Sequence, residues 1–240
     1  VRYCTEMDWW GAENLSAVPG EVGASAVQNI GAYGVEAGCI ISEVRAMSVS
    51  DGSIRTFGRE ECKYGYRTSV FKTDLKGQYV VTSVVYRLQK KACPNLDYGV
   101  LRQTVESMGE ATLKNIRAAV MQIRSSKLPD PAVLGNAGSF FVNPVISDIH
   151  LKKIRNAYPD VPSYSSEDGG YKVPAGWLIE KCGWKGKSMG PVAVHDRQAL
   201  VLVNKGGATG LDVKALADAV IADVRGRFGI ELRTEVNYIS

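Results

Sequence analysis

The sequence predicts a mixed α+β protein, and three observations favour this class. Residues 40–49 and 53–57 flank the turn pair Asp51-Gly52, which is the pattern of a β-hairpin with a type I′ turn. Apolar residues recur at helical spacing through 112–124, so this stretch predicts an amphipathic helix. Strand and helix patterns continue in both halves of the chain without an internal repeat.

The first half of the chain predicts one more strand and then a boundary. The strand is expected in the apolar, β-rich run 79–88 (YVVTSVVYRL), before the helix at 112–124. After the helix, Pro129 and Pro131 each restrict the conformation of the residue that precedes them. We therefore expect a domain boundary after residue 128.

The second half predicts two short helices and a strand. Ser147 is expected to cap a helix that ends near Pro159. The stretch 175–182 is expected to form a short helix that Gly183 stops. The run 192–203 is expected to contain a strand.

A long helix and an alternating segment end the chain. The apolar stripe of the helix comprises Val213, Leu216, Val220 and Val224. Gly229 is expected to close this helix, and 230–239 alternates between apolar and polar residues as a strand does. In such a strand Glu235 points away from Leu232 and Val236.

Composition narrows the function classes. The 240 residues are 45% apolar and 22% charged, with 29 basic against 25 acidic residues, which excludes intrinsic disorder. The longest stretch without charge, 131–147, is too short and too polar for a spanning helix, so no membrane partner is expected. The net charge of +4 suits anionic small molecules, and no Lys/Arg-rich block predicts nucleic-acid binding.

Cysteine and histidine usage favours a reduced, cytoplasmic protein without a metal site. The five cysteines form no C-x-x-C pair, and the two histidines have no metal-ligand spacing. His195 is expected to be structural. The first residues, VRYCTE, include no apolar signal core and begin with Val1, so we expect the chain to start partway through a longer protein.

Glycine gathers in two segments, 19–34 and 135–141. Such runs permit positive φ and leave backbone N–H groups accessible. A phosphate or a ring edge needs this kind of backbone for close approach. Two ordinary surface loops are the alternative interpretation.

Specific strings then carry a resemblance to a known family. In chain order they are ENLS (13–16), PGEVGASAVQNIGAYGVE (19–36), ECKYGYRTSVFK (61–72), KLPDP (127–131), GNAGSFFVNP (135–144), AGWLIEKCG (175–183) and AVHDRQALVLVN (193–204). Together they resemble the UDP-N-acetylenolpyruvoylglucosamine reductase family, also called UDP-N-acetylmuramate dehydrogenases. The resemblance runs from about residue 13 to residue 236. It points to the subgroup that has a tyrosine loop closing over the substrate.

The resemblance implies a two-domain flavoenzyme. Residues 1–128 are expected to form an FAD-binding domain of the vanillyl-alcohol-oxidase-like flavin fold, completed by a strand at 230–240. Residues 129–229 are expected to form a smaller α+β substrate-binding domain. The family's opening segment, with a Gly-Gly-Gly-Ser-Asn-type loop, has no counterpart in this chain.

The implied reaction is a hydride relay in peptidoglycan synthesis. NADPH reduces FAD, and the hydride then passes to the enolpyruvyl C3 of UDP-N-acetylglucosamine enolpyruvate, with protonation at C2 giving UDP-N-acetylmuramate. Negative charge accumulates toward the substrate carboxylate, so the site needs a cation, an acid and a proton donor. The expected partners are these small molecules alone, and the chain is expected to be a monomer.

Three residues match the family's catalytic positions. Arg67 matches the arginine at the substrate carboxylate, Ser139 the proton donor to C2, and Glu235 the acid that polarises that carboxylate. Taken singly, each is explained better without catalysis: Arg67 as a solvated or ion-paired arginine, Ser139 as a turn or helix-cap serine, and Glu235 as an exposed strand residue. Their occurrence together, in family order, favours catalysis.

Other matched positions imply ligand contacts. The substrate contacts are Tyr98, Lys127, Asn143 and Gln198. The FAD contacts are Pro19, Gly20, Val22, Gly23, Gln28, Asn29, Gly31, Ala32 and Tyr33. The glycine spacing here does not fit the G-x-G-x-x-G fingerprint of a dinucleotide-binding βαβ unit. This mismatch agrees with the resemblance, because the family uses a different flavin fold. A solvated Lys127 and a half-buried loop Tyr98 are the plain alternatives.

Small departures from the family pattern are Thr68, Val142 and Thr234, in place of an acid, a lysine and a proline. None of them removes a catalytic side chain. Two rival functions stay open. One is a non-catalytic UDP-sugar-binding fragment that has lost FAD with its first subdomain, and the other is an oxidase of the same flavin fold.

Overall fold

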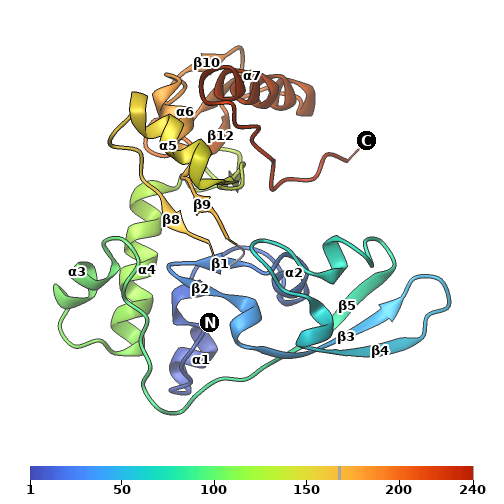
Figure 1. The fold of residues 1–240 in the computed structure, drawn as a ribbon. Coiled ribbons are helices and arrows are strands. Elements are labelled where there is room, and N and C mark those ends of the chain that lie inside the picture. The colour runs from blue at the N-terminus through green and yellow to red at the C-terminus, as the bar shows by residue number, and fades with distance from the viewer. Residues whose placement is uncertain (167–168, 240) are drawn as a thin grey trace. The chain divides into compact units, whose positions relative to one another are not determined.

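The structure, a computed structural model, describes residues 1–166 and 169–239 and divides into two compact units, Val1–Arg124 and Ser125–Ser240. Each unit combines strands with helices, so the predicted α+β class is confirmed (Figure 1). The boundary falls within the helix α4 (Leu113–Lys127), shortly before the expected break. No helix in the described ranges is long and apolar enough to cross a bilayer.

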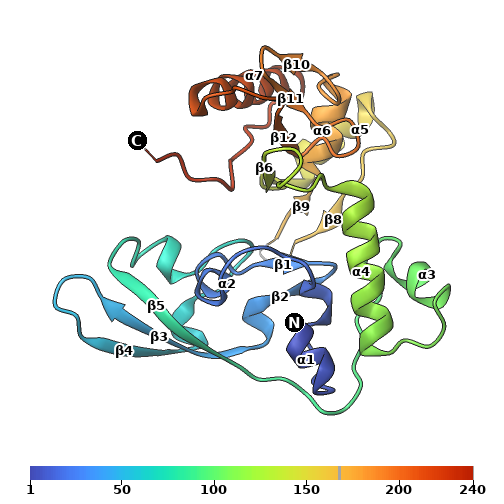
Figure 2. The same cartoon turned by 180° about the vertical axis from the view of Figure 1, so that it is seen from behind.

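A three-stranded antiparallel sheet organises the first unit. Its central strand β3 (Ile41–Ser48) lies between β4 (Ile54–Gly58) and β5 (Tyr79–Tyr86), as Figure 2 shows from behind. The helix α2 (Val22–Gln28) packs against β5. Phe57 of β4 is almost fully buried between other aromatic rings, so this hairpin is anchored to the core of the unit. The predicted hairpin and third strand are therefore confirmed.

The turn of that hairpin differs from the predicted type I′ turn. The backbone N–H of Ser48 donates to the carbonyl of Ser53 at 2.8 Å, which closes a loop over 49–52 rather than a two-residue turn. Gly52 has a φ of 72°, but Asp51 does not have the positive φ that a type I′ turn requires. Instead the Asp51 carboxylate accepts bonds from the backbone N–H and hydroxyl of Ser53 at 3.1 and 2.8 Å. This side-chain turn competes with the backbone turn and widens the loop.

The predicted amphipathic helix is confirmed as α4, which packs against α3 (Leu101–Glu106). Buried residues of this cluster include Leu101, Val105, Ile116 and Val120. The other elements of the first unit are α1 (Arg2–Glu6), η1 (Glu13–Leu15), β1 (Gly31–Ala32), β2 (Val35–Glu36), η2 (Ala37–Cys39), η3 (Glu60–Cys62) and η4 (Val70–Lys72).

Within residues 125–166 and 169–239, the second unit contains two small sheets and, after the end of α4, three helices. The order β10-β11-β12-β6 defines a four-stranded antiparallel sheet, and β7-β9-β8 defines a three-stranded one. The strands are β6 (Asn136–Ser139), β7 (Val145–Ile146), β8 (Tyr164–Ser165), β9 (Tyr171–Lys172), β10 (Ser188–Met189), β11 (Val192–Val194) and β12 (Val201–Asn204). The predicted run 192–203 thus contains two strands rather than one.

The three helices of the second unit agree with the sequence patterns. They are α5 (Asp148–Ala157), α6 (Ala175–Lys181) and α7 (Gly210–Phe228). The Ser147 side chain caps α5 by accepting the His150 backbone N–H at 3.2 Å. Gly229 has a φ of 65° and closes α7, because only glycine adopts this left-handed conformation at low cost.

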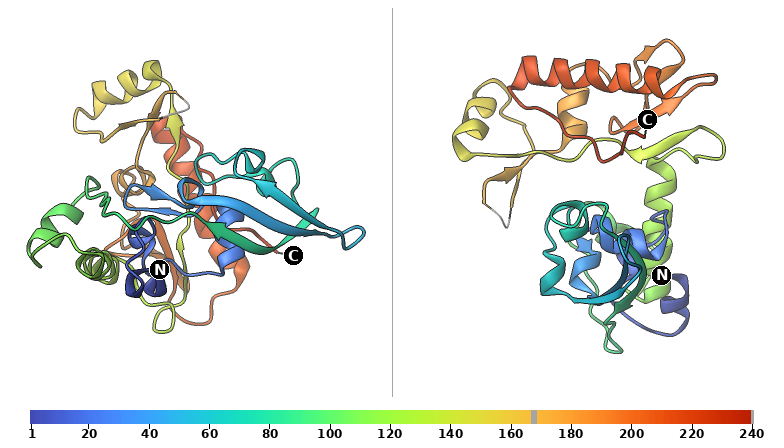
Figure 3. Two further views of the ribbon diagram at one scale, coloured as in Figure 1. Left: turned by 90° about the horizontal axis from the view of Figure 1, so that it is seen from below. Right: turned by 90° about the vertical axis from the view of Figure 1, so that its right-hand side faces the viewer.

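The strand predicted at 230–240 is wrong. After α7 the chain turns back along the helix (Figure 3, right) and forms only an isolated bridge between Thr234 and Phe141. Toward Glu231 the ladder cannot continue because Pro144 has no backbone N–H to donate, and on the other side the N–H of Phe140 is bonded to Leu200 instead. This segment belongs to the second unit, where it is bonded to Phe140 and Val142, and its predicted part in completing the first domain stays a prediction. Residue 240 lies outside the described residues.

Alternation nevertheless has a physical basis in this segment. Ile230 and Leu232 are 4% and 3% exposed and belong to the main core of the second unit, whereas Glu231 and Arg233 are exposed. One side of an extended chain is therefore buried without a ladder of strand pairing. An alternating pattern reports burial on one side, and strand pairing needs a partner as well.

The capping box at the start of α7 yields a stability prediction. Thr209 accepts the backbone N–H of Asp212 at 3.3 Å, and the Asp212 carboxylate accepts the backbone N–H and the hydroxyl of Thr209 at 2.8 and 2.7 Å. Thr209→Ala should lower the free energy of unfolding by about 1 kcal/mol in urea titrations. The control is Thr104→Ala, which removes a hydroxyl that does not cap a helix. Equal losses in both variants would contradict the capping role.

The same box makes this stability pH-dependent. Hydrogen bonds from the Thr209 hydroxyl and backbone N–H hold the pKa of Asp212 below its usual value. Because the folded pKa is the lower one, the carboxylate stabilises the fold above its ordinary pKa, and this contribution is lost as the pH falls through the folded value. The difference between wild type and Thr209→Ala should therefore shrink in acid below about pH 4. A difference that grows on acidification would contradict this sign.

Candidate functional site

The predicted catalytic Arg67 lies at the tip of a tight turn in the first unit. Gly65 and Thr68 exchange two backbone hydrogen bonds of 3.2 and 3.1 Å, which leaves Tyr66 and Arg67 as the two turn residues. Arg67 has a φ of 56°, a value that favours glycine or asparagine at this position of a turn. A bulky residue in that conformation costs about 1–3 kcal/mol, and such strain persists where the surroundings fix it.

The Arg67 side chain is fixed by partners from the predicted cofactor segment. Its Nη2 donates to the carbonyl of Gly31 at 2.6 Å, and its Nη1 lies 3.7 Å from Oε1 of Glu36. The guanidinium also lies 5.2 Å from the centre of the Tyr66 ring. The side chain is only 20% exposed. The cation is therefore held in one orientation rather than moving freely in solvent.

Asn29, a predicted FAD contact, links the same segments. Its Nδ2 donates to Oε2 of Glu36 at 2.8 Å and to the carbonyl of Gly65 at 2.9 Å, while its Oδ1 accepts the backbone N–H of Gly38 at 2.8 Å. The side chain is buried and all these bonds are within one unit. The structure thus brings together the group that we call the Arg67 cluster, which is Asn29, Gly31, Glu36 and Arg67.

Tyr33 lies beside this cluster at the tip of the β1–β2 hairpin. Tyr33 and Gly34 have φ values of 49° and 80°, which is the signature of a two-residue type I′ turn. The Tyr33 ring packs edge-on against the ring of Tyr98, with 5.9 Å between their centres. Burial raises the pKa of the Tyr33 hydroxyl, and the nearby Arg124 guanidinium opposes that rise. A predicted cofactor residue and a predicted substrate residue are therefore in contact.

The remaining predicted FAD residues divide into exposed and packed positions. Pro19, Gly20 and Val22 are exposed before and at the start of α2. A Cβ on Gly23 would lie 3.2 Å from the Val81 carbonyl, so this glycine allows α2 to approach β5. Gln28 and Ala32 are half-buried. The contacts of these residues with FAD stay predictions.

Ser139 and Glu235 lie on neighbouring segments of the second unit. Ser139 is exposed at the end of β6, where it pairs with Val201 of β12. The next residue, Phe140, donates its N–H to the carbonyl of Leu200 at 2.7 Å and accepts the N–H of Glu235 at 2.9 Å. Phe140 therefore joins the segments that carry two of the three predicted catalytic residues.

Gln198 lies in the tight connection between β11 and β12. Its carbonyl accepts the N–H of Val201 at 3.0 Å, and its side-chain Oε1 accepts the N–H of Leu200 at 3.4 Å. Leu200 is the residue whose carbonyl receives the Phe140 N–H. The predicted residues of the second unit are thus connected through backbone bonds around Phe140.

Asn143 and Lys127 have different surroundings. The Asn143 Oδ1 accepts the backbone N–H of Ala175 at 2.9 Å and so caps α6, whose N-cap residue is Pro174. Asn143 therefore has a structural function in addition to its predicted substrate role. Lys127 is exposed as the last residue of α4. Both substrate roles stay predictions.

His195 is buried, and both ring nitrogens have polar neighbours in its own turn. Its Nδ1 accepts the backbone N–H of Arg197 at 3.3 Å, and its Nε2 lies 3.4 Å from a carboxylate oxygen of Asp196. These contacts favour the structural interpretation. The described part of the chain contains no group of three or more metal-ligating side chains.

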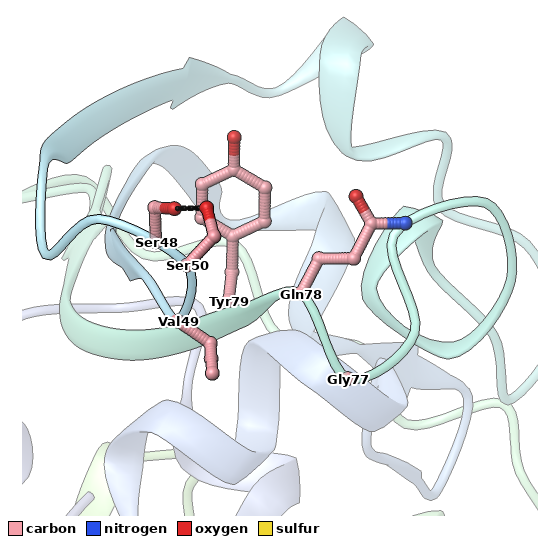
Figure 4. Close-up of a pocket in the computed structure, with 6 residues that line it drawn as sticks. All are labelled: Ser48, Val49, Ser50, Gly77, Gln78 and Tyr79. Carbon is pink, nitrogen blue, oxygen red and sulfur yellow. Dashed lines mark hydrogen bonds between the residues drawn. The ribbon is translucent and has the colours of Figure 1, made fainter.

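Two hollows are lined by other residues than those of the Arg67 cluster. One of about 320 Å³ is lined by residues of the hairpin loop and the start of β5, and it includes none of the predicted site residues (Figure 4). The other, of about 210 Å³, is lined by Val142, Pro144, Val145, Glu231 and Arg233. Its lining flanks Asn143 and includes Val142, whose N–H donates to the Arg233 carbonyl at 2.9 Å.

Sequence reasoning missed three residues of the first unit. Glu36 pairs with Arg67, and the fully buried Asn14 donates to two backbone carbonyls. Arg124 is half-buried beside Tyr33, and burial lowers the pKa of its guanidinium. Arg124 follows the apolar stripe of α4 by one residue, and a cation so close to a buried face is the signal that could have identified it.

Comparison with known proteins gives both sequence and fold relationships. Residues 130–239 match the family model described as "UDP-N-acetylenolpyruvoylglucosamine reductase, C-terminal domain". The UDP-N-acetylenolpyruvoylglucosamine reductase of Bacteroides fragilis (strain YCH46) is 50% identical over 239 residues, covering 100% of this chain and 72% of that protein. The one from Porphyromonas gingivalis (strain W83) is 52% identical over 240 residues, covering 100% and 71%.

A solved structure shares the fold. The crystal structure of UDP-N-acetylenolpyruvylglucosamine reductase from Thermus caldophilus matches with a TM-score of 0.64 at 22% identity, covering 98% of this chain and 66% of that chain. The fold is thus the mixed α/β architecture of a solved reductase. By sequence the chain belongs to the UDP-N-acetylenolpyruvoylglucosamine reductase family, as its motifs predicted. It spans about 70% of the length of the relatives it matches and about two thirds of the solved chain.

The packing of Gly31 in the Arg67 cluster can be tested directly. A Cβ at Gly31 would overlap the Arg67 guanidinium and lie 2.9 Å from Cγ of Glu36. Gly31→Ala should therefore lower the free energy of unfolding by about 1–3 kcal/mol, measured by denaturant titration. Gly58→Ala is the matched control, because a Cβ there would lie 3.6 Å from the nearest atom, an ordinary contact. If both variants behave alike, the cluster is not packed as described.

Proposed function

We propose that this protein reduces UDP-N-acetylglucosamine enolpyruvate to UDP-N-acetylmuramate with NADPH, by way of bound FAD, in peptidoglycan precursor synthesis in the cytoplasm. Its membership of the reductase family supports the proposal. The residues 1–124 with the Arg67 cluster act as the flavin-binding part, of the vanillyl-alcohol-oxidase-like fold, and the second unit binds the substrate. The protein acts as a monomer whose only partners are small molecules.

One observation supports this function most strongly. Arg67, matched to the family's carboxylate-binding arginine, has a strained backbone and a guanidinium fixed on the Gly31 carbonyl. Gly31 belongs to the segment matched to the FAD contacts. Strain held in place by a dedicated hydrogen bond is typical of a functional residue and is uncommon at a solvated surface arginine.

The first unit fits the chemistry of a flavin dinucleotide. The space that a Cβ would occupy at Gly20 has no neighbour within 4 Å, so the backbone there is open to a diphosphate. Arg124 is half-buried, has no carboxylate partner among the described residues, and suits the same anion. The edges of Tyr33 and Tyr98 suit a flat ring system. FAD held by these residues would supply a hydride to C3 of the substrate, with NADPH as the source of that hydride.

Arg67 acts on the substrate carboxylate. When C3 gains a hydride, negative charge develops at C2 and spreads into the carboxylate. A guanidinium already oriented by Gly31 and Glu36 meets this charge without reorganisation, which is the source of most electrostatic catalysis. A lysine would keep the charge and lose the planar fork.

Ser139 and Glu235 complete the chemistry from the second unit. The Ser139 hydroxyl delivers a proton to C2, so that a hydride at C3 and a proton at C2 together saturate the double bond. Glu235 hydrogen-bonds the substrate carboxylate and draws charge away from C2. Their joint attachment to Phe140 supports this assignment, because a displacement of one segment shifts both groups.

Half-reaction kinetics test the role of Ser139. Ser139→Ala should leave the reduction of the flavin by NADPH unchanged, because that step needs no proton at C2. Reoxidation of the reduced flavin by UDP-N-acetylglucosamine enolpyruvate should slow by about 10²–10⁴-fold in stopped-flow absorbance. Ser188→Ala is the control, since Ser188 is exposed on β10 and its hydroxyl accepts a bond from the Lys205 ammonium group. Equal rates in both half-reactions of Ser139→Ala would remove the serine from this role.

A further inference from the structure

Asn14 is a fully buried side chain that joins two segments far apart in sequence. It lies in η1 and is 0% exposed. Its Nδ2 donates to the carbonyl of Tyr33 at 2.7 Å and to the carbonyl of Asn95 at 2.8 Å. Both partners are acceptors, so the orientation of the amide is fixed by its surroundings.

The two segments also contact each other directly. The Asn95 Nδ2 donates to the carbonyl of Gly34 at 3.2 Å, and the rings of Tyr33 and Tyr98 meet edge to face. A Cβ on Gly34 would lie 3.4 Å from the Asn95 side chain. Asn14 therefore stands at the base of a contact between the hairpin that presents Tyr33 and the segment that presents Tyr98.

An asparagine at position 14 has an energetic cost that an apolar side chain filling the same space would not have. Its own Oδ1 is buried without a hydrogen-bond partner among the described residues, which is unfavourable for a buried acceptor. Tyr33 also adopts a left-handed backbone that is costly for an aromatic residue. An apolar side chain would avoid the first cost but would leave the two carbonyls without donors. The Asn14 amide therefore matches these two carbonyls, whose positions it fixes.

We propose that Asn14 is a positioning residue that holds the Tyr98 segment against the Tyr33 hairpin, so that Tyr98 is in place when the nucleotide-sugar binds. The nature of the ligand rests on the proposed function. The Asn14 clamp, by which we mean the two hydrogen bonds from Asn14 to the carbonyls of Tyr33 and Asn95, does not depend on that function. Asn14 reaches neither ring and acts only through the backbone on which they are mounted. Its loss should free the Tyr98 segment and leave the Arg67 cluster in place, because none of the bonds of that cluster involves Asn14.

The ligand-free protein tests the clamp. The Tyr98 side chain is 56% exposed and is a site for chymotrypsin. Asn14→Ser should raise the rate of cleavage at Tyr98 about tenfold, because the segment opens locally more often. Asn115→Ser is the matched control, since the Asn115 Nδ2 also donates to two backbone carbonyls, those of Met108 and Glu110, away from this contact. Unchanged cleavage in Asn14→Ser, or an equal rise in Asn115→Ser, would overturn the proposal.

Steady-state kinetics then separate positioning from general destabilisation. Asn14→Ser should raise KM for UDP-N-acetylglucosamine enolpyruvate about tenfold or more and change the rate of flavin reduction by NADPH less than about threefold. Adding Tyr98→Ala should raise KM little further in the Asn14→Ser background, because the clamp acts through Tyr98. In the Asn115→Ser background it should raise KM as much as it does in the wild-type protein. Additive effects in both backgrounds would contradict it.

A second variant guards against a folding defect. Asn95→Ala removes the surface bond to Gly34 and leaves Asn14 buried as it is, so it should loosen the same segment to a smaller extent. If Asn95→Ala leaves both cleavage and KM unchanged, the clamp is wrong. If the wild-type protein does not turn over the enolpyruvyl substrate, the proposed function fails, and the cleavage experiment still decides the role of Asn14.

Discussion

The hydrogen bond between the Arg67 guanidinium and the Gly31 carbonyl is the interaction on which the site in the first unit depends. It joins two tight turns, the one that carries Arg67 and the hairpin that carries Tyr33. Asn29 and Glu36 stabilise both turns, because Asn29 is bonded to Glu36 and to the Gly65 carbonyl while Glu36 pairs with Arg67. A Cβ at residue 31 would overlap the guanidinium in this position, so the glycine lets the two groups approach closely. A short segment of glycine-rich chain thereby sets the orientation of a cation, which is the property that charge stabilisation in a reaction requires.

In the second unit, the predicted site residues are held mainly by backbone hydrogen bonds rather than by side-chain partners. Ser139, Gln198 and Glu235 come from three segments widely separated in sequence, and each segment is bonded to Phe140 or to its partner Leu200. The core beneath is formed by α6, α7 and the strands, with Leu178, Val192, Leu216 and Val220 fully buried. Polar residues held on such a rigid base lose little freedom on binding a substrate, which favours accurate positioning.

The sequence predicted most of the regular elements because their signals are local. Helical spacing identified α4 and α7, Ser147 identified the start of α5, and β-rich runs identified β3 and β5. Its errors arose where non-local factors decide: the Asp51 carboxylate widened the hairpin turn, and Pro144 stopped a ladder that alternation alone suggested. In the site, family strings located Arg67 and Gly31, but Glu36, Asn14 and Arg124 became visible only through their contacts. Single-residue patterns do not reveal which side chains face one another.

The proposed function requires a flavin that is reduced by one small molecule and reoxidised by another. An anaerobic absorbance titration of the purified protein with FAD tests this most directly. The flavin absorbance should bleach on addition of NADPH and return in full, one equivalent at a time, on addition of UDP-N-acetylglucosamine enolpyruvate. A colourless protein that takes up no FAD while still binding the nucleotide-sugar would contradict the account, as would a reduced flavin that oxygen alone reoxidises.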